Sequence, residues 1–134
     1  VTKEGGEGFV REMDQAEVCL TKSWSLEAMH RTTHQMMRLE LGQGEGRERM
    51  ELWFKRAMAL DPDDYEACKD KLWYLLPHWY GDHEKMLKFG RSCLTHPRWK
   101  GQVPLAGSIE GGSTRLLAEE GGVVRYPKLL RALL

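Results

Sequence analysis

Two stretches of the chain that lie 35 residues apart share residues at matching positions. Phe54 corresponds to Phe89, and Pro62 corresponds to Pro97, at that same 35-residue offset. A period near 34 residues in helical sequence is typical of stacked helical hairpins, in which small residues let helices approach and a proline closes the second helix. The offset therefore predicts a helical-hairpin repeat. The remaining matches are Leu52 with Leu87, Arg56 with Arg91, and the small residues Ala57 with Ser92.

Helical periodicity runs through the first hundred residues of the chain. Apolar residues recur every three or four positions, which is the spacing of one face of an α-helix, and no alternation typical of a strand competes with it. The fold class that this pattern predicts is all-α, with antiparallel helical hairpins over residues 9–100. The predicted helices cover residues 9–20, 26–41, 47–60 and 65–76, and a fifth helix lies between Asp82, its N-cap, and Pro97.

Residue types that favour the start or the end of a helix lie near most of these predicted boundaries. Ser25 is the expected N-cap of the second helix, and Gly42 is the residue expected just beyond its end. Asp63 and Glu66 have the spacing of a capping box at the start of the fourth helix, and Pro77 is expected to end it.

Glycines gather in three groups, which we interpret as joints between helices. They lie at 5–8, 42–46 and 101–122. Residues 101–134 are therefore expected to form an irregular, glycine-rich C-terminal segment of a single domain that spans 1–134, with short helices as an alternative at 114–120 and 127–134.

The residues WFKRAMALDPDD, which begin at Trp53, resemble the second helix and closing turn of a tetratricopeptide repeat. The positions that match this family are aromatic Phe54, small Ala57 and helix-ending Pro62. The sequence ACKDKLWYLLPHWYGDHEKMLKFGR, which begins at Ala67, is similar to a family of uncharacterised bacterial proteins that is frequent in planctomycete-type genomes. This resemblance implies tetratricopeptide-like hairpins and a bacterial source, and it implies no reaction.

The net charge of the chain is zero, because 20 basic residues balance 20 acidic ones. This balance removes the electrostatic reason to expect a nucleic acid or an acidic membrane surface as partner. The longest unbroken apolar run, Leu72–Leu76, has five residues, whereas a membrane span needs about 20. The sequence thus predicts a soluble protein whose partner is neither a nucleic acid nor a membrane.

The N-terminus and the cysteines bear on where the protein works. Residues 1–8 contain no apolar stretch typical of a secretory signal, and the first residue is not Met, which fits either a piece of a longer chain or a processed chain. An odd number of cysteines at wide spacing argues against a disulfide framework and favours a reducing compartment. We therefore expect a cytoplasmic location. The three cysteines are Cys19, Cys68 and Cys93.

Histidines, cysteines and aspartates could ligate a metal by residue type, but their spacing does not favour it. His30 and His34 lie one helical turn apart, but Arg31 stands where a zinc protease needs its glutamate, so we interpret the pair as a solvated helix face. Cys68 and Cys93 fall on apolar faces, where unpaired cysteines behave as small hydrophobic residues. The spacing equally disfavours mixed Cys/His ligation with His78, His83 or His96, and calcium binding by Asp61, Asp63 and Asp64.

Sequence signatures of nucleophilic catalysis and of phosphate binding are absent. The chain has no Gly-x-Ser-x-Gly motif and no glycine-rich loop followed by Lys and Ser or Thr. We therefore predict no enzymatic activity, no catalytic residue, no cofactor and no metal.

The aromatic group Trp73, Tyr74, Trp79 and Tyr80 is the best candidate for a binding site, although packing between adjacent hairpins is the favoured interpretation of these residues. In a tetratricopeptide-like array the inner face of the fourth helix includes Lys69 and Trp73. Lys69 matches a basic position of the carboxylate-clamp members of that family, but Asp70 and Trp73 replace their asparagines, which argues against binding of chaperone tails. The predicted partner-binding residues are Lys69, Trp73, Trp79 and Tyr80.

These observations favour a non-enzymatic interaction or scaffold module that binds a protein or peptide. The alternatives are a structural segment of a larger protein, and a metal-binding or enzymatic domain that uses the Cys and His residues. Two hairpins leave end faces uncovered, so we expect either further repeats in a longer chain or self-association.

Overall fold

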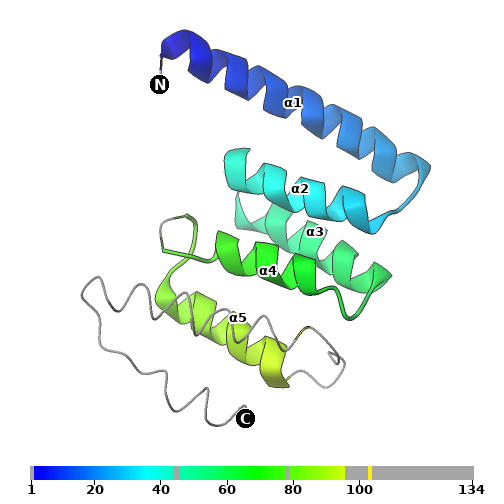
Figure 1. Cartoon of the computed structure of the whole chain (residues 1–134), viewed down its shortest axis with the longest axis vertical. Coiled ribbons are helices and arrows are strands. Elements are labelled where there is room, and N and C mark those ends of the chain that lie inside the picture. The colour runs from blue at the N-terminus through cyan, green and yellow to red at the C-terminus, as the bar shows by residue number, and fades with distance from the viewer. Residues whose placement is uncertain (1, 44–45, 78, 96–102, 104–134) are drawn as a thin grey trace. The chain divides into compact units, whose positions relative to one another are not determined.

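The computed structural model describes residues 2–43, 46–77, 79–95 and 103 (Figure 1). All regular secondary structure in these ranges is helical, which confirms the predicted all-α fold. The predicted glycine-rich segment lies outside the described residues except for Val103. The helices are α1 (Lys3–Leu26), α2 (His30–Gln43), α3 (Arg47–Leu60), α4 (Tyr65–Tyr74) and α5 (His83–Thr95).

The chain divides into two compact units. We call Val1–Pro62 the N-terminal unit and Asp63–Leu134 the C-terminal unit. In the N-terminal unit, α1 packs on α2 and α2 packs on α3, and in the C-terminal unit α4 packs on α5 (Figure 1). Each of these contacts joins helices that follow one another in the chain, which confirms the predicted helical hairpins within each unit. Among described residues, none of these helices is long and apolar enough to cross a membrane.

Each unit has its own apolar core, drawn from the helix faces that the periodicity predicts. Burial of a large apolar side chain contributes about 1.5–3 kcal/mol, so these residues dominate the stability of each unit. In the N-terminal unit the buried residues include Met36, Met37, Leu39, Met50, Trp53, Phe54 and Ala57. In the C-terminal unit they include Ala67, Cys68, Leu72, Tyr74, Leu75, Met86, Phe89, Cys93 and Val103.

The 35-residue offset also relates α2 to α4, the first helices of the two hairpins, although their residue types do not match in the sequence. Thr33 and Cys68 are both fully buried, and so are Met37 and Leu72 to within a few per cent. Thr33 and Cys68 differ in chemistry and share only their burial. Three more pairs of buried residues stand at the same offset: Thr32 with Ala67, Met36 with Lys71, and Glu40 with Leu75.

An ion network joins the three helices of the N-terminal unit. Arg49 in α3 places its Nε 3.0 Å from Oε1 of Glu40 in α2, whose side chain is fully buried. The other end of the guanidinium pairs with Glu17 in α1, and Gln43 donates to the second oxygen of Glu17 at 3.2 Å. Arg49 therefore compensates a buried carboxylate and links α1 to the α2–α3 hairpin at the same time.

Cation–π contacts of an arginine stabilise the packing of a tryptophan of α1 on a tryptophan of α3. The indole rings of Trp24 and Trp53 meet edge to face, with their centroids 5.4 Å apart. The guanidinium of Arg56 lies 4.5 Å from the Trp53 ring centroid and 5.3 Å from that of Trp24. Such contacts are each worth about 0.5–1 kcal/mol or more when partly desolvated.

The first glycine group is not a joint. Gly5, Gly6 and Gly8 all lie within α1, which begins at Lys3 and is longer than the predicted helix 9–20. Thr2 caps this helix, because its Oγ1 accepts a hydrogen bond from the Gly5 amide at 3.1 Å. A good N-cap and a long continuous helix thus outweigh the unfavourable helix propensity of glycine, about 1 kcal/mol per residue.

The predicted boundary between the first two helices is also wrong. Ser25 is not an N-cap but part of the last turn of α1, where its hydroxyl donates to the Lys22 carbonyl at 2.7 Å. Leu26 is the last residue of α1 and is 78% exposed, and α2 begins only at His30. Serine can satisfy its hydroxyl inside a helix as well as cap one, so its presence alone does not fix the boundary.

Gly42 lies inside α2 rather than beyond its end, so the predicted loop over 42–46 starts too early. A Cβ atom built on Gly42 would overlap the terminal methyl group of Met13 in α1. Gly42 therefore leaves room for the end of the Met13 side chain where α1 packs on α2, and it does not terminate the helix.

The predicted capping box of α4 is displaced by one residue. Asp64, not Asp63, is the N-cap, and its carboxylate accepts a hydrogen bond from the Ala67 amide at 3.0 Å. Asp63 instead accepts a hydrogen bond from the Val103 amide at 3.1 Å. Glu66 forms an ion pair with Lys69. The helix ends at Tyr74, three residues before Pro77.

The predicted N-cap of α5 is confirmed. Asp82 accepts a hydrogen bond from the Lys85 amide at 2.8 Å and forms an ion pair with the Lys85 ammonium, also at 2.8 Å.

Candidate binding surface

The exposed face of α4 carries two of the four predicted binding residues. Lys69 and Trp73 lie one turn apart, so they share a side of the helix. Trp73 is 51% exposed. The Lys69 ammonium lies 3.0 Å from Oε2 of Glu66 and 5.8 Å from the ring centroid of Tyr65. An exposed ion pair of this kind contributes at most about 1 kcal/mol, so a partner with its own carboxylate can replace Glu66 at little cost.

The other two predicted residues follow α4 in the turn that leads to α5. The Tyr80 ring stacks on the Tyr74 ring with centroids 4.9 Å apart. The ring centroids of Trp79 and Tyr80 are 6.4 Å apart. Tyr74 is buried, whereas Trp79 is 50% exposed and Tyr80 is 41% exposed. The three rings thus lead from buried Tyr74 to exposed Trp79. The stacking of Tyr80 on Tyr74 fixes the position of the exposed rings.

Gly81 makes this turn possible. A Cβ atom at this position would overlap the carbonyl group of Leu75, so only glycine allows the chain to approach the end of α4 so closely. Backbone hydrogen bonds close the turn: the Tyr80 amide donates to the Tyr74 carbonyl at 3.2 Å, and the Trp79 amide donates to the Leu76 carbonyl at 2.9 Å.

The four aromatic residues that the sequence singles out therefore differ in burial: one is buried and three are exposed. Tyr74 packs in the core, as the packing interpretation expects, whereas Trp73, Trp79 and Tyr80 are large and exposed. Lys69 and Trp73 form one pair on α4, and Trp79 and Tyr80 form a second pair in the following turn. We call these four residues the aromatic surface of the C-terminal unit.

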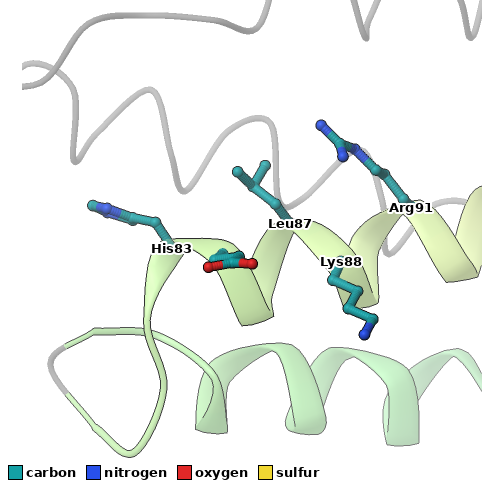
Figure 2. A pocket seen from close by; sticks show the side chains of 5 residues that line it. His83, Leu87, Lys88 and Arg91 are labelled. Carbon is teal, nitrogen blue, oxygen red and sulfur yellow. The ribbon is translucent and has the colours of Figure 1, made fainter.

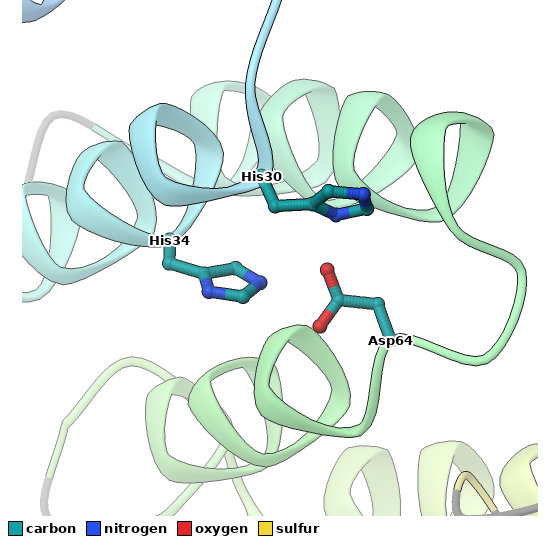
Figure 3. Close-up of side chains that lie close together, drawn as sticks. All are labelled: His30, His34 and Asp64. Carbon is teal, nitrogen blue, oxygen red and sulfur yellow. The ribbon is translucent and has the colours of Figure 1, made fainter.

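His30 and His34 lie where the sequence predicts, one turn apart on the same side of α2 (Figure 3). Their ring centroids are 6.3 Å apart. Figure 3 also draws Asp64, at the start of α4, where its carboxylate caps that helix. His78 and His96, which the sequence offers for mixed Cys/His ligation, lie outside the described residues.

The DUF4034 family, described as a domain of unknown function, matches residues 36–102, which is half of the chain. The chain belongs to the DUF4034 family. The match begins within α2 and includes α3, α4 and α5, so it contains the whole aromatic surface. No curated protein and no solved structure matches the chain.

Within the DUF4034 region, side chains of α5 line an open hollow that the sequence does not reveal (Figure 2). His83, Leu87 and Arg91 lie at intervals of four residues and project from the same side of the helix, and Lys88 projects from another side. Leu87 is half-buried between exposed polar neighbours. Glu84 completes the lining among the described residues.

The two cysteines of the DUF4034 region are fully buried, as the sequence predicts, but they also contact each other. Cys68 in α4 and Cys93 in α5 form a side-chain hydrogen bond, which together with burial raises the pKa of the Cys68 thiol far above its ordinary value. Lys71, whose ammonium lies 4.6 Å from the Phe89 ring centroid, opposes this shift only in part. Widely spaced cysteines gave no signal of this contact in the sequence.

Proposed function

We propose that this chain is a non-enzymatic interaction module, and that the aromatic surface of its C-terminal unit binds a protein segment or peptide. The proposal is carried by one observation: Trp73 and Trp79 are each about half exposed beside a packed core. Large aromatic side chains that remain exposed in a folded unit are typical of interaction sites, because their burial by a partner supplies much of the binding energy.

The second support for the proposal is preorganisation. Tyr80 is stacked on buried Tyr74, and the turn is closed by backbone hydrogen bonds. A partner therefore does not need to order these rings when it binds, which lowers the entropic cost of association. Lys69, at the other pair, adds a cation that a carboxylate of the partner can reach.

We further infer that the hairpins are tetratricopeptide-like repeats from a bacterial protein. The inference is supported by the 35-residue offset, which relates Phe54 to Phe89 in sequence and Thr33 to Cys68 in burial. Hairpin repeats of this kind present extended surfaces to partner chains, and additional repeats in a longer chain would enlarge that surface.

The proposal is tested by selecting peptides from a random displayed library on the full chain and measuring their affinity in solution. We expect Lys69→Glu/Trp73→Ala to weaken the selected peptides at least tenfold, because loss of one aromatic hot-spot residue typically costs about 2 kcal/mol or more.

The matched control is Leu52→Ala/Lys55→Glu. It makes the same kinds of change at exposed positions of α3. The control should bind within about twofold of the unchanged chain, and circular dichroism should show that both variants remain helical. Equal weakening in both variants, or no selected peptide at all, would contradict the proposal.

A further inference from the structure

The contact between Cys68 and Cys93 follows from the antiparallel packing of α4 and α5. Cys68 is the fourth residue of α4, and Cys93 is the third residue from the end of α5. An antiparallel hairpin places the start of its first helix opposite the end of its second helix. Both side chains point into the interface, where they are fully buried and hydrogen-bonded to each other.

The contact brings together two sulfur atoms from residues far apart in sequence. A disulfide requires close approach of the two sulfurs and side chains that point toward each other. A direct thiol–thiol contact across two packed helices meets the second requirement. Both cysteines are free thiols in the structure.

We propose that Cys68 and Cys93 are a dithiol pair that a hydroperoxide oxidises to an intramolecular disulfide joining α4 to α5. One cysteine loses its thiol proton, its thiolate attacks hydrogen peroxide and the O–O bond breaks; the hydroxide that leaves takes up that proton, so a sulfenic acid and one water are formed. The neighbouring thiol then attacks the sulfenic sulfur, so that the S–S bond forms, the S–O bond breaks and a second water leaves. Two thiols thus lose two electrons and two protons, and hydrogen peroxide is reduced to two waters.

The environment makes this oxidation slow but directs its product. Burial and the thiol hydrogen bond hold Cys68 protonated, which disfavours the thiolate that begins the reaction. Once either sulfur is oxidised, however, the other is its immediate neighbour, and an intramolecular reaction between adjacent groups outpaces further oxidation. Exposed Cys19 should therefore lose its thiol earlier than the pair does.

The test uses the full chain carrying Cys19→Ser, so that only the buried pair can react. The protein is incubated with hydrogen peroxide for at least ten times the half-life measured for loss of the Cys19 thiol in the unchanged chain. It is then denatured and treated with a thiol-alkylating reagent. We expect mass spectrometry to show that more than half of the molecules are monomers that have lost two hydrogen atoms and carry no alkyl group. Digestion should yield a peptide in which Cys68 is linked to Cys93. Reduction should return two thiols that the reagent can alkylate.

Cys19→Ser/Cys93→Ser is the matched control, because it leaves Cys68 without its neighbour. In this variant a sulfenic acid trap should label Cys68, whereas it should not accumulate label in the protein with both cysteines. The Cys19→Ser protein, which keeps both buried cysteines, tests the inference even if this control variant does not fold. Recovery of two free thiols after the full incubation, oxidation of each cysteine separately, or a disulfide between two chains would overturn the inference.

Discussion

Replacement of Arg49 by methionine tests whether the ion network holds the N-terminal unit together. Arg49→Met keeps much of the length of the side chain and removes the charge that faces Glu40, whose side chain has no exposed area. Loss of one partner of a buried ion pair typically costs about 3–5 kcal/mol, because the remaining charge is left uncompensated. The Arg49 side chain is 31% exposed, so water can reach its site, and we expect the lower end of this range, about 3 kcal/mol.

The assay is urea unfolding followed by the fluorescence of Trp24 and Trp53, which lie in the N-terminal unit and contact each other, in a chain whose other three tryptophans are replaced by phenylalanine. A cost near 3 kcal/mol is a large part of the stability of a small unit, so the midpoint should fall clearly. Glu40→Gln in the Arg49→Met background should recover part of the loss, because it removes the buried charge. Together with the Glu40→Gln single variant, these proteins complete a double-mutant cycle that gives the coupling between the two residues.

Arg47→Met is the matched control. Arg47 is in the first turn of α3 and is 58% exposed, with its Nε 3.9 Å from the Glu51 carboxylate. Its removal should cost less than about 0.5 kcal/mol. If Arg49→Met costs no more than Arg47→Met, or if Glu40→Gln makes the Arg49→Met variant less stable, the Glu40 charge is not compensated in the way described.

Three further substitutions test local features of the C-terminal unit. Asp64→Ala removes the N-cap of α4 and should lower the free energy of unfolding by about 1 kcal/mol in urea titrations, with no loss indicating a different cap. Gly81→Ala should destabilise the unit by more than about 1 kcal/mol and lower its thermal midpoint, because a Cβ overlaps the Leu75 carbonyl; an unchanged midpoint would refute the close approach. The Lys85 ammonium and amide lower the pKa of Asp82 from 3.8, so the stabilisation is present above that pH and is lost as the pH falls through the folded pKa. Asp82→Asn should lack this acid-dependent part of the unfolding free energy, and an unchanged pH profile would contradict it.

Periodicity predicted the helices better than it predicted their ends. The buried face of α3 is the one that the spacing of Met50, Trp53 and Phe54 indicates. The cap of α4 was displaced because two adjacent aspartates can both accept an amide hydrogen bond, and only tertiary contacts assign Asp63 to Val103. Propensity alone cannot decide such cases, since the competing local structures differ by about 1 kcal/mol or less.

The candidate site was partly predictable. Residue type singled out Trp73, Trp79 and Tyr80, but the exposure of Trp79 and Tyr80 depends on the turn at Gly81, which sequence spacing does not specify. The contact between Cys68 and Cys93 was missed because it depends on the register of two packed helices. Once the hairpin is known, antiparallel register alone brings the two cysteines close together.

Indole N–H signals in an NMR titration test the central claim, binding at the aromatic surface, most directly. The chain has five tryptophans, each with one such signal, which single substitutions can assign. A peptide selected on the full chain should shift the signals of Trp73 and Trp79, and those of Trp24 and Trp53 in the N-terminal unit should stay in place. Binding that leaves Trp73 and Trp79 unchanged, or that shifts only Trp24 and Trp53, would contradict the assignment of the aromatic surface as the binding site.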